Sequence, residues 1–180
     1  MDIGKLKFPI GKFQFENDFN EHQIENWIKT ISEFPEKVKK TTDNLSTEQL
    51  NWKYRPNGWM IKQVVHHCAD SHMNSFIRFK LALTEKLPII RPYYEDRWAE
   101  LVDSVNNDLF DSITLIKGLH SKWVKLLSSL NKKDLIKEFV HPEHGTKISL
   151  AENIAFYAWH CEHHLTHILQ GIKSEGKYNV

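Results

Sequence analysis

The chain has 180 residues, a length typical of one domain, and its 24 Lys and Arg residues are balanced by 23 Asp and Glu residues. The net charge is +1 and no basic cluster recurs, which argues against a nucleic-acid-binding protein. No stretch of about 18 apolar residues occurs and the first residues lack a signal-peptide pattern, so we expect a cytoplasmic protein with a single domain over residues 1–180. Cys68 and Cys161 lie among apolar residues and are expected to be buried thiols.

The first third of the chain predicts an arm followed by two helices. Residues 1–19 contain aromatic side chains without a helical period and predict an extended arm that packs on the domain. From about Glu21 to Lys40 apolar residues recur every three or four positions, as in an amphipathic helix, and Pro35 can kink or end it. Residues 46–49 form a capping box that opens a short helix.

The rest of the chain predicts three more long amphipathic helices, over about residues 59–85, 107–130 and 149–172. Residues 87–107 are expected to be irregular, with a short helix over 96–101. Phe139–Ile148 predicts a small hairpin that turns at Glu143 to Gly145. Four long helices, each with one apolar face, predict an all-α protein that folds as a four-helix bundle.

Four of the eleven histidines lie within Trp159–His167, in the last predicted helix. Residues four apart share a helix face, so His160 with His164, or His163 with His167, could bind one metal ion. The apolar face is centred about 110° from His160, and His164 lies about 40° toward it. We therefore expect His160 and His164 at the edge of the core and the other pair nearer to solvent. Without a metal, the pattern describes two packed and two surface histidines.

A third ligand is expected on the second long helix. There His67 flanks the apolar face much as His160 does, whereas His66 lies about 100° farther out and is expected in solvent. His72 lies in the middle of the apolar face and is expected in the core, hydrogen-bonded to a neighbour. His67, His160 and His164 would supply three imidazoles and leave one position open, the pattern of a catalytic metal site.

Imidazole ligands suit zinc, nickel, cobalt or ferrous iron, and we expect one divalent ion per chain, zinc or nickel first. An open position permits hydrolysis of an amide or ester, or attack by an external thiol on an electrophile. Asp70 is the nearest carboxylate to His67 and a candidate general base, although its direction also suits an outer or surface group. Three other residues share the His67 flank and could line the pocket of a small-molecule substrate: Ser71, Asn74 and Arg78. Arg78 could hold a substrate carboxylate or form a surface salt bridge.

Two segments, Gly58–Lys80 and Trp159–Ile168, resemble the histidine-bearing helices of the DinB-like superfamily, most closely its YfiT branch of metal-dependent hydrolases. The likeness includes Pro9-Ile10-Gly11 and Arg91-Pro92-Tyr93. It implies a four-helix bundle, a mononuclear site at His67, His160 and His164, and commonly a homodimer.

Some members of this family resemble transferases that use a low-molecular-weight thiol such as bacillithiol. Many members carry Gln at the position of His167, so the resemblance assigns that residue no role. Three functions follow as alternatives: a metal-dependent hydrolase, a thiol S-transferase, and a metal-binding dimer without catalysis.

Overall fold

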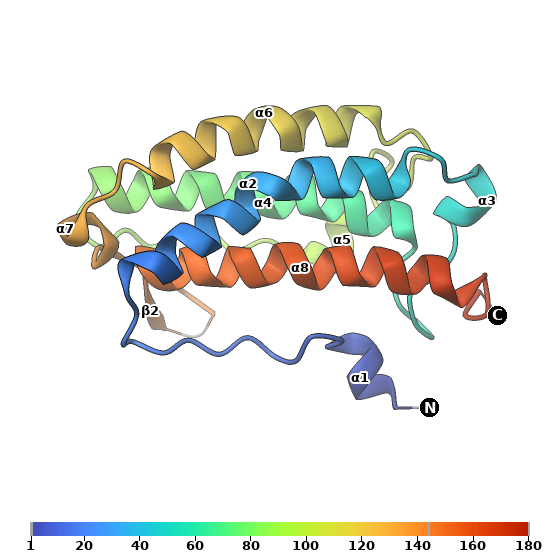
Figure 1. The fold of residues 1–180 in the computed structure, drawn as a ribbon, viewed down its shortest axis with the longest axis horizontal. Coiled ribbons are helices and arrows are strands. Elements are labelled where there is room, and N and C mark those ends of the chain that lie inside the picture. Colours follow the sequence, from blue (N-terminus) through green and yellow to red (C-terminus); the bar gives the residue numbers. More distant parts are fainter. Residues whose placement is uncertain (1, 144, 180) are drawn as a thin grey trace.

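The computed structural model describes residues 2–143 and 145–179, and four long helices dominate it (Figure 1). Each member of one helix pair packs against both members of the other, so the helices enclose one core and the predicted four-helix bundle is confirmed. The first pair is α2 (Glu21–Thr42) and α4 (Ile61–Thr84), and the second is α6 (Phe110–Leu127) and α8 (Leu150–Ser174). A short helix, α3 (Thr47–Leu50), opens on the predicted capping box at Ser46.

The connections between the helices set their directions. In Figure 1, α2 and α8 run one way and α4 and α6 run the other way, so α4 lies antiparallel to its neighbour α8. Because α4 and α6 are parallel, the chain must return along a helix of 24 residues, about 36 Å. This return is the irregular segment predicted over residues 87–107, and it contains the short helix α5 (Glu95–Trp98).

The link from α6 to α8 carries a short helix, α7 (Lys132–Leu135), and the predicted hairpin. Strand β1 (Glu138–His141) pairs antiparallel with β2 (Thr146–Ser149). One residue of the predicted turn, position 144, lies outside the described residues. Ser149 then caps α8 by accepting a hydrogen bond from the Glu152 N–H.

The first residues differ from the extended arm that the sequence predicts. Ile3–Lys7 form the helix α1, whose first N–H groups are capped by the Asp2 carboxylate. The arm then runs along α8 (Figure 1), and the Trp159 indole donates a hydrogen bond to the Gly11 carbonyl. One face of α8 is therefore covered by the arm.

Helix α2 does not end at Pro35 but continues to Thr42. A proline has no N–H, so the carbonyl of Ile31, four residues earlier, lacks its usual helical donor. The imidazole of His120 on α6 lies 2.6 Å from that carbonyl oxygen and supplies the missing hydrogen bond.

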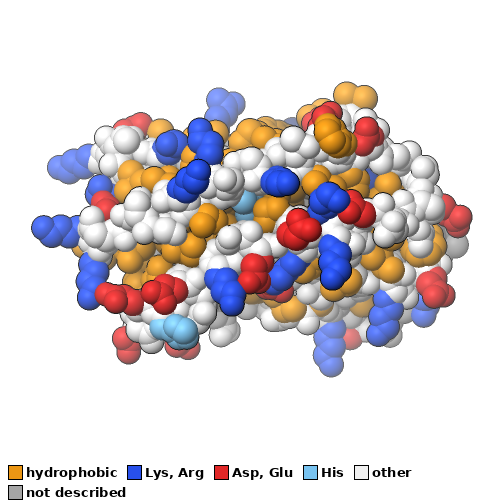
Figure 2. Space-filling model, turned by 45° about the horizontal axis from the view of Figure 1, so that its top comes forward, with side chains coloured by type: hydrophobic (Ala, Val, Ile, Leu, Met, Phe, Trp, Pro, Cys, Tyr) orange, Lys and Arg blue, Asp and Glu red, His pale blue; other side chains and the backbone are white. Residues whose placement is uncertain are grey.

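The core lies between the four long helices and contains both cysteine thiols, which are free and buried as predicted. On the face shown in Figure 2, basic and acidic side chains are intermixed, with hydrophobic side chains exposed between them. Within the described residues, no helix combines the length and apolar character that a membrane span requires.

Candidate metal centre

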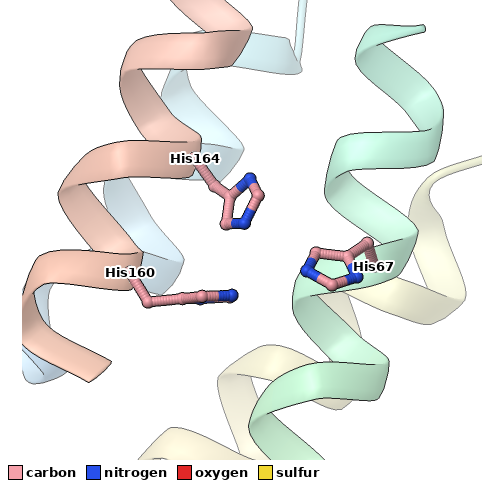
Figure 3. Close-up of side chains that lie close together, drawn as sticks. All are labelled: His67, His160 and His164. Carbon is pink, nitrogen blue, oxygen red and sulfur yellow. The ribbon is translucent and has the colours of Figure 1, made fainter. Parts of the chain in front are cut away.

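Three histidines converge where α4 meets α8, and they are the three that the sequence predicts. His67 projects from α4, while His160 and His164 project from successive turns of α8 (Figure 3). One ring nitrogen of each lies within 4.8 Å of the others. All three side chains are buried.

The spacing and protonation of this trio suit a divalent cation. Zinc binds imidazole nitrogens at about 2.0–2.1 Å, so two ligands of one ion stand at most about 4.2 Å apart. Small ring rotations would bring the nitrogens from within 4.8 Å to that separation. Burial lowers the pKa of His67 to about 4 and holds the pKa values of His160 and His164 well below 6.5. The rings are therefore neutral at pH 7, as metal ligands must be.

A cavity of about 570 Å³ opens on the trio, which leaves room for a small molecule beside a bound ion. The ring of Trp59 forms part of its wall, with its centroid 4.7 Å from that of His67. Tyr93 and Tyr157 form another part, and burial raises the pKa of both phenols. The cavity therefore combines an aromatic wall with polar groups near the histidines.

Two of the four predicted pocket or base residues line this cavity. Ser71 is buried, and its hydroxyl lies 3.4 Å from His160 Nε2 and 3.2 Å from the Tyr157 hydroxyl. Arg78 also lines the cavity, and no ion pair to it is found among residues 2–143 and 145–179, so the salt-bridge alternative has no support.

Asp70 and Asn74 are absent from the cavity lining formed by the described residues. The Asn74 amide instead donates a hydrogen bond to the Asp70 carbonyl. Asp70 is half-buried, and burial together with the nearby Asp103 raises the pKa of its carboxyl to about 6. Its position does not support the role of a base that acts at the histidine trio.

The prediction that His66 lies in solvent is wrong. Its side chain is buried, with Nδ1 2.8 Å from the Ser112 hydroxyl and Nε2 3.0 Å from the Asn106 carbonyl. Helix α6 and the segment before it cover this side of α4, and a helical wheel of α4 alone cannot show that. His66 is not a member of the convergent trio.

The prediction that His163 and His167 lie nearer to solvent is also wrong, because the arm covers them. His163 stacks on Trp159, and the ring of Phe8 lies 6.0 Å from its own. His167 donates a hydrogen bond from Nε2 to the Lys7 carbonyl at 3.2 Å. Burial lowers the pKa of His163 to about 4 and that of His167 to about 3, so both are neutral at pH 7.

His72 is a hydrogen-bonded core residue, as predicted. Its Nε2 lies 3.0 Å from His160 Nδ1, and its Nδ1 lies 2.7 Å from Nε2 of His120. His120, which is buried on α6, was not among the residues predicted from the sequence. A signal for it exists, because His120 lies four residues after Ile116 and three before Trp123 and so belongs to the apolar face of that helix.

The DinB superfamily model matches residues 30–168. The chain belongs to the DinB superfamily. An Oceanobacillus iheyensis protein named "Putative metal-dependent hydrolase" is 48% identical over 162 residues, which cover 90% of this chain and 93% of that protein. A Bacillus cereus protein of the same name is 49% identical over 167 residues, which cover 92% of this chain and 95% of that protein.

The chain is also similar to the solved structure of YfiT from Bacillus subtilis, which is described as a probable metal-dependent hydrolase with an unusual four-helix bundle topology. The TM-score is 0.92 at 41% identity, and the match covers 96% of this chain and 98% of YfiT. This likeness agrees with the bundle described above and confirms the resemblance to the YfiT branch.

Proposed function

We propose that this DinB-superfamily protein is a metal-dependent hydrolase in which His67, His160 and His164 hold one divalent cation. The observation that carries the proposal is the convergence of three buried, neutral imidazoles beside a cavity of about 570 Å³. Three protein ligands with space for a further one are typical of catalytic metal sites. The names of the relatives from Oceanobacillus and Bacillus and of YfiT support the same activity.

The ligand set favours zinc or nickel. The trio offers only imidazole nitrogens, which suit these borderline ions better than magnesium or calcium, whose ligands are oxygens. Cys161 is adjacent to a ligand in sequence, but its thiol is buried and burial raises its pKa well above 9.0, so it is not a competing ligand.

A bound divalent ion would supply Lewis acidity, which polarises a carbonyl and makes an attacking water more acidic. The chain itself places a donor beside the ligands, because Ser71 carries a hydroxyl 3.4 Å from His160 Nε2. Arg78 provides a cation in the cavity wall, where it can bind a carboxylate of the substrate. We infer that Ser71 orients the reacting group and that Arg78 selects anionic substrates.

A low-molecular-weight-thiol S-transferase is the second candidate. Asp70 is the single acidic residue of α4, and it does not line the cavity within the described residues. Water attack is most effective with a protein base, whereas a thiol is acidic enough to lose its proton at a metal without one. Glu95, Asp96 and Glu143 also line the cavity, so the S-transferase candidate depends on the acidity that a thiol would have at the metal and not on the lack of a carboxylate.

Tag-free protein loaded with zinc or nickel, assayed on esters, amides and electrophiles with and without a small thiol, tests both functions. Ester or amide turnover without thiol, absent from the His67→Ala variant, would support the hydrolase. Conjugation of an electrophile only when thiol is present would support the transferase. Stoichiometric metal without turnover in either assay would contradict both and leave a metal-binding protein.

A further inference from the structure

A chain of hydrogen bonds leads from the trio through the core to the backbone of α2. His160 Nδ1 lies 3.0 Å from His72 Nε2, and His72 Nδ1 lies 2.7 Å from His120 Nε2. His120 Nδ1 lies 2.6 Å from the Ile31 carbonyl oxygen. Each of the three rings is at most 6% exposed, so water does not compete for these bonds.

The donor and the acceptor are fixed in the last hydrogen bond of this series, between His120 and Ile31. The Ile31 carbonyl can only accept, so the hydrogen of this bond must lie on His120 Nδ1. That carbonyl is available because the residue four positions later is Pro35, which has no N–H to donate. The helix thus leaves one strong acceptor unsatisfied, and His120 supplies the donor that it lacks.

The nitrogen that carries the hydrogen in His120 determines which nitrogen carries it in His72, and His72 in turn determines this for His160. Burial lowers the pKa of His120 to about 4, and His72 is fully buried with two imidazoles as its hydrogen-bond partners, so both rings are neutral and each carries one N–H. With its hydrogen on Nδ1, His120 must accept at Nε2, and His72 must therefore donate from Nδ1. His72 then accepts at Nε2, which requires the hydrogen of His160 to lie on Nδ1.

We propose that Pro35, His120 and His72 are positioning residues that hold His160 in its Nδ1–H tautomer and so keep the Nε2 lone pair free for a metal ion. His160 Nε2 is the nitrogen near the Ser71 hydroxyl, at 3.4 Å. His164 has no equivalent support, because its Nδ1 has no hydrogen-bond partner among the described residues. The metal part of this inference rests on the proposed function, whereas the tautomer belongs to the metal-free protein.

The tautomers can be measured directly by long-range proton–nitrogen NMR correlation on metal-free protein labelled with ¹⁵N-histidine. We expect the hydrogen on Nδ1 in His72, His120 and His160. A hydrogen on Nε2 of His160, or an even mixture, would overturn the proposal. This measurement needs no variant and no activity, so it stands even if the protein is not a hydrolase.

Two substitutions at His120 separate positioning from simple core filling. The amide of His120→Gln still offers one donor and one acceptor, whereas His120→Phe offers neither. We expect mixed tautomers at His160 and about 10–100-fold weaker zinc binding in His120→Phe, with values near wild type in His120→Gln. Wild-type tautomer and zinc affinity in folded His120→Phe, or an equal loss in both variants, would overturn the proposal.

Two further variants act as controls for instability. Pro35→Ala restores an N–H that competes for the Ile31 carbonyl while making α2 intrinsically more stable. It should therefore shift the His160 tautomer and weaken zinc binding without unfolding the bundle, and an unchanged tautomer would contradict the proposal. His66→Phe removes two hydrogen bonds of α4 that do not belong to the His160–His72–His120 series. This variant should leave the His160 tautomer unchanged. Loss of the Nδ1–H form in His66→Phe would show that any core change has this effect.

Discussion

The ring of His67 on α4 lies 4.8 Å from the ring of His164 on α8, although the two residues belong to opposite halves of the chain. The antiparallel packing of α4 against α8 creates this proximity, and the crossover through residues 85–109 makes that packing possible. Helix α4 also packs on α6, and α8 also packs on α2. Removal of the metal should therefore leave the four-helix bundle folded.

Single alanine substitutions should separate ligands from their neighbours. His67→Ala, His160→Ala and His164→Ala should each lower metal affinity at least about 100-fold, because one of three ligands is removed. Zinc titration measures the affinity, and circular dichroism should show a helical protein in each case. His66→Ala is the matched control and should bind zinc as the wild type does. A full site in His67→Ala with an empty one in His66→Ala would refute the assignment.

Stability should fall in acid because buried histidines are neutral in the folded protein. The pKa of His120 is lowered by burial from 6.5 to about 4, so the unfolded chain binds more protons between these pH values. The free energy of unfolding therefore decreases as the pH falls from about 6.5 toward 4, and this residue alone contributes about 2 kcal/mol of that loss at pH 5. Urea denaturation of metal-free protein at pH 7.5 and pH 5 measures the difference. His120→Gln, which cannot titrate, should reduce it by about that amount.

Replacing either of two helix glycines by alanine should change the stability of the protein, but in opposite directions. A Cβ on Gly171 would lie 2.7 Å from Cγ1 of the buried Ile61, so Gly171→Ala should overpack the α4–α8 contact. Overpacking costs about 1–3 kcal/mol against about 1 kcal/mol of helix propensity, which gives a net loss of about 1 kcal/mol. Gly118→Ala meets no atom within 4 Å and should gain up to about 1 kcal/mol. Thermal denaturation compares them, and greater stability in Gly171→Ala would contradict the packing described.

Arg78 should matter for substrates that carry a carboxylate. If the protein hydrolyses esters, Arg78→Ala should raise KM about 10-fold for an anionic ester and leave a neutral analogue unaffected, since a charge-assisted bond worth about 1.4 kcal/mol is lost. Steady-state kinetics on the matched pair of esters measures this. Arg91→Ala, an exposed arginine that does not line the cavity, is the control. An equal rise for both esters would argue against selection by charge.

The helical period of the sequence predicts the four long helices and the faces that carry His67, His160 and His164, because both follow from the spacing of apolar residues. The same reasoning fails for His66, His163 and His167, whose burial depends on segments from elsewhere in the chain. A wheel describes one helix and contains no information about α6 or about the arm that covers α8. The short α1 helix was missed because its stability comes from a cap at Asp2 and not from an apolar face.

Pro35 and His120 show a second limit of sequence reasoning. Each is visible alone, as a proline inside a helical pattern and as a histidine on an apolar face. Their relationship appears only when α2 and α6 lie side by side and the Ile31 carbonyl meets the imidazole. Hydrogen bonds between distant helices leave no periodic trace in the sequence.

The central claim is that three imidazoles on α4 and α8 hold one divalent ion. Elemental analysis of tag-free protein, dialysed against zinc or nickel and then against metal-free buffer, tests it most directly. We predict one equivalent of metal per wild-type chain and none in a variant that lacks all three histidines. Absence of metal from the wild type, or equal retention by the triple variant, would contradict the account.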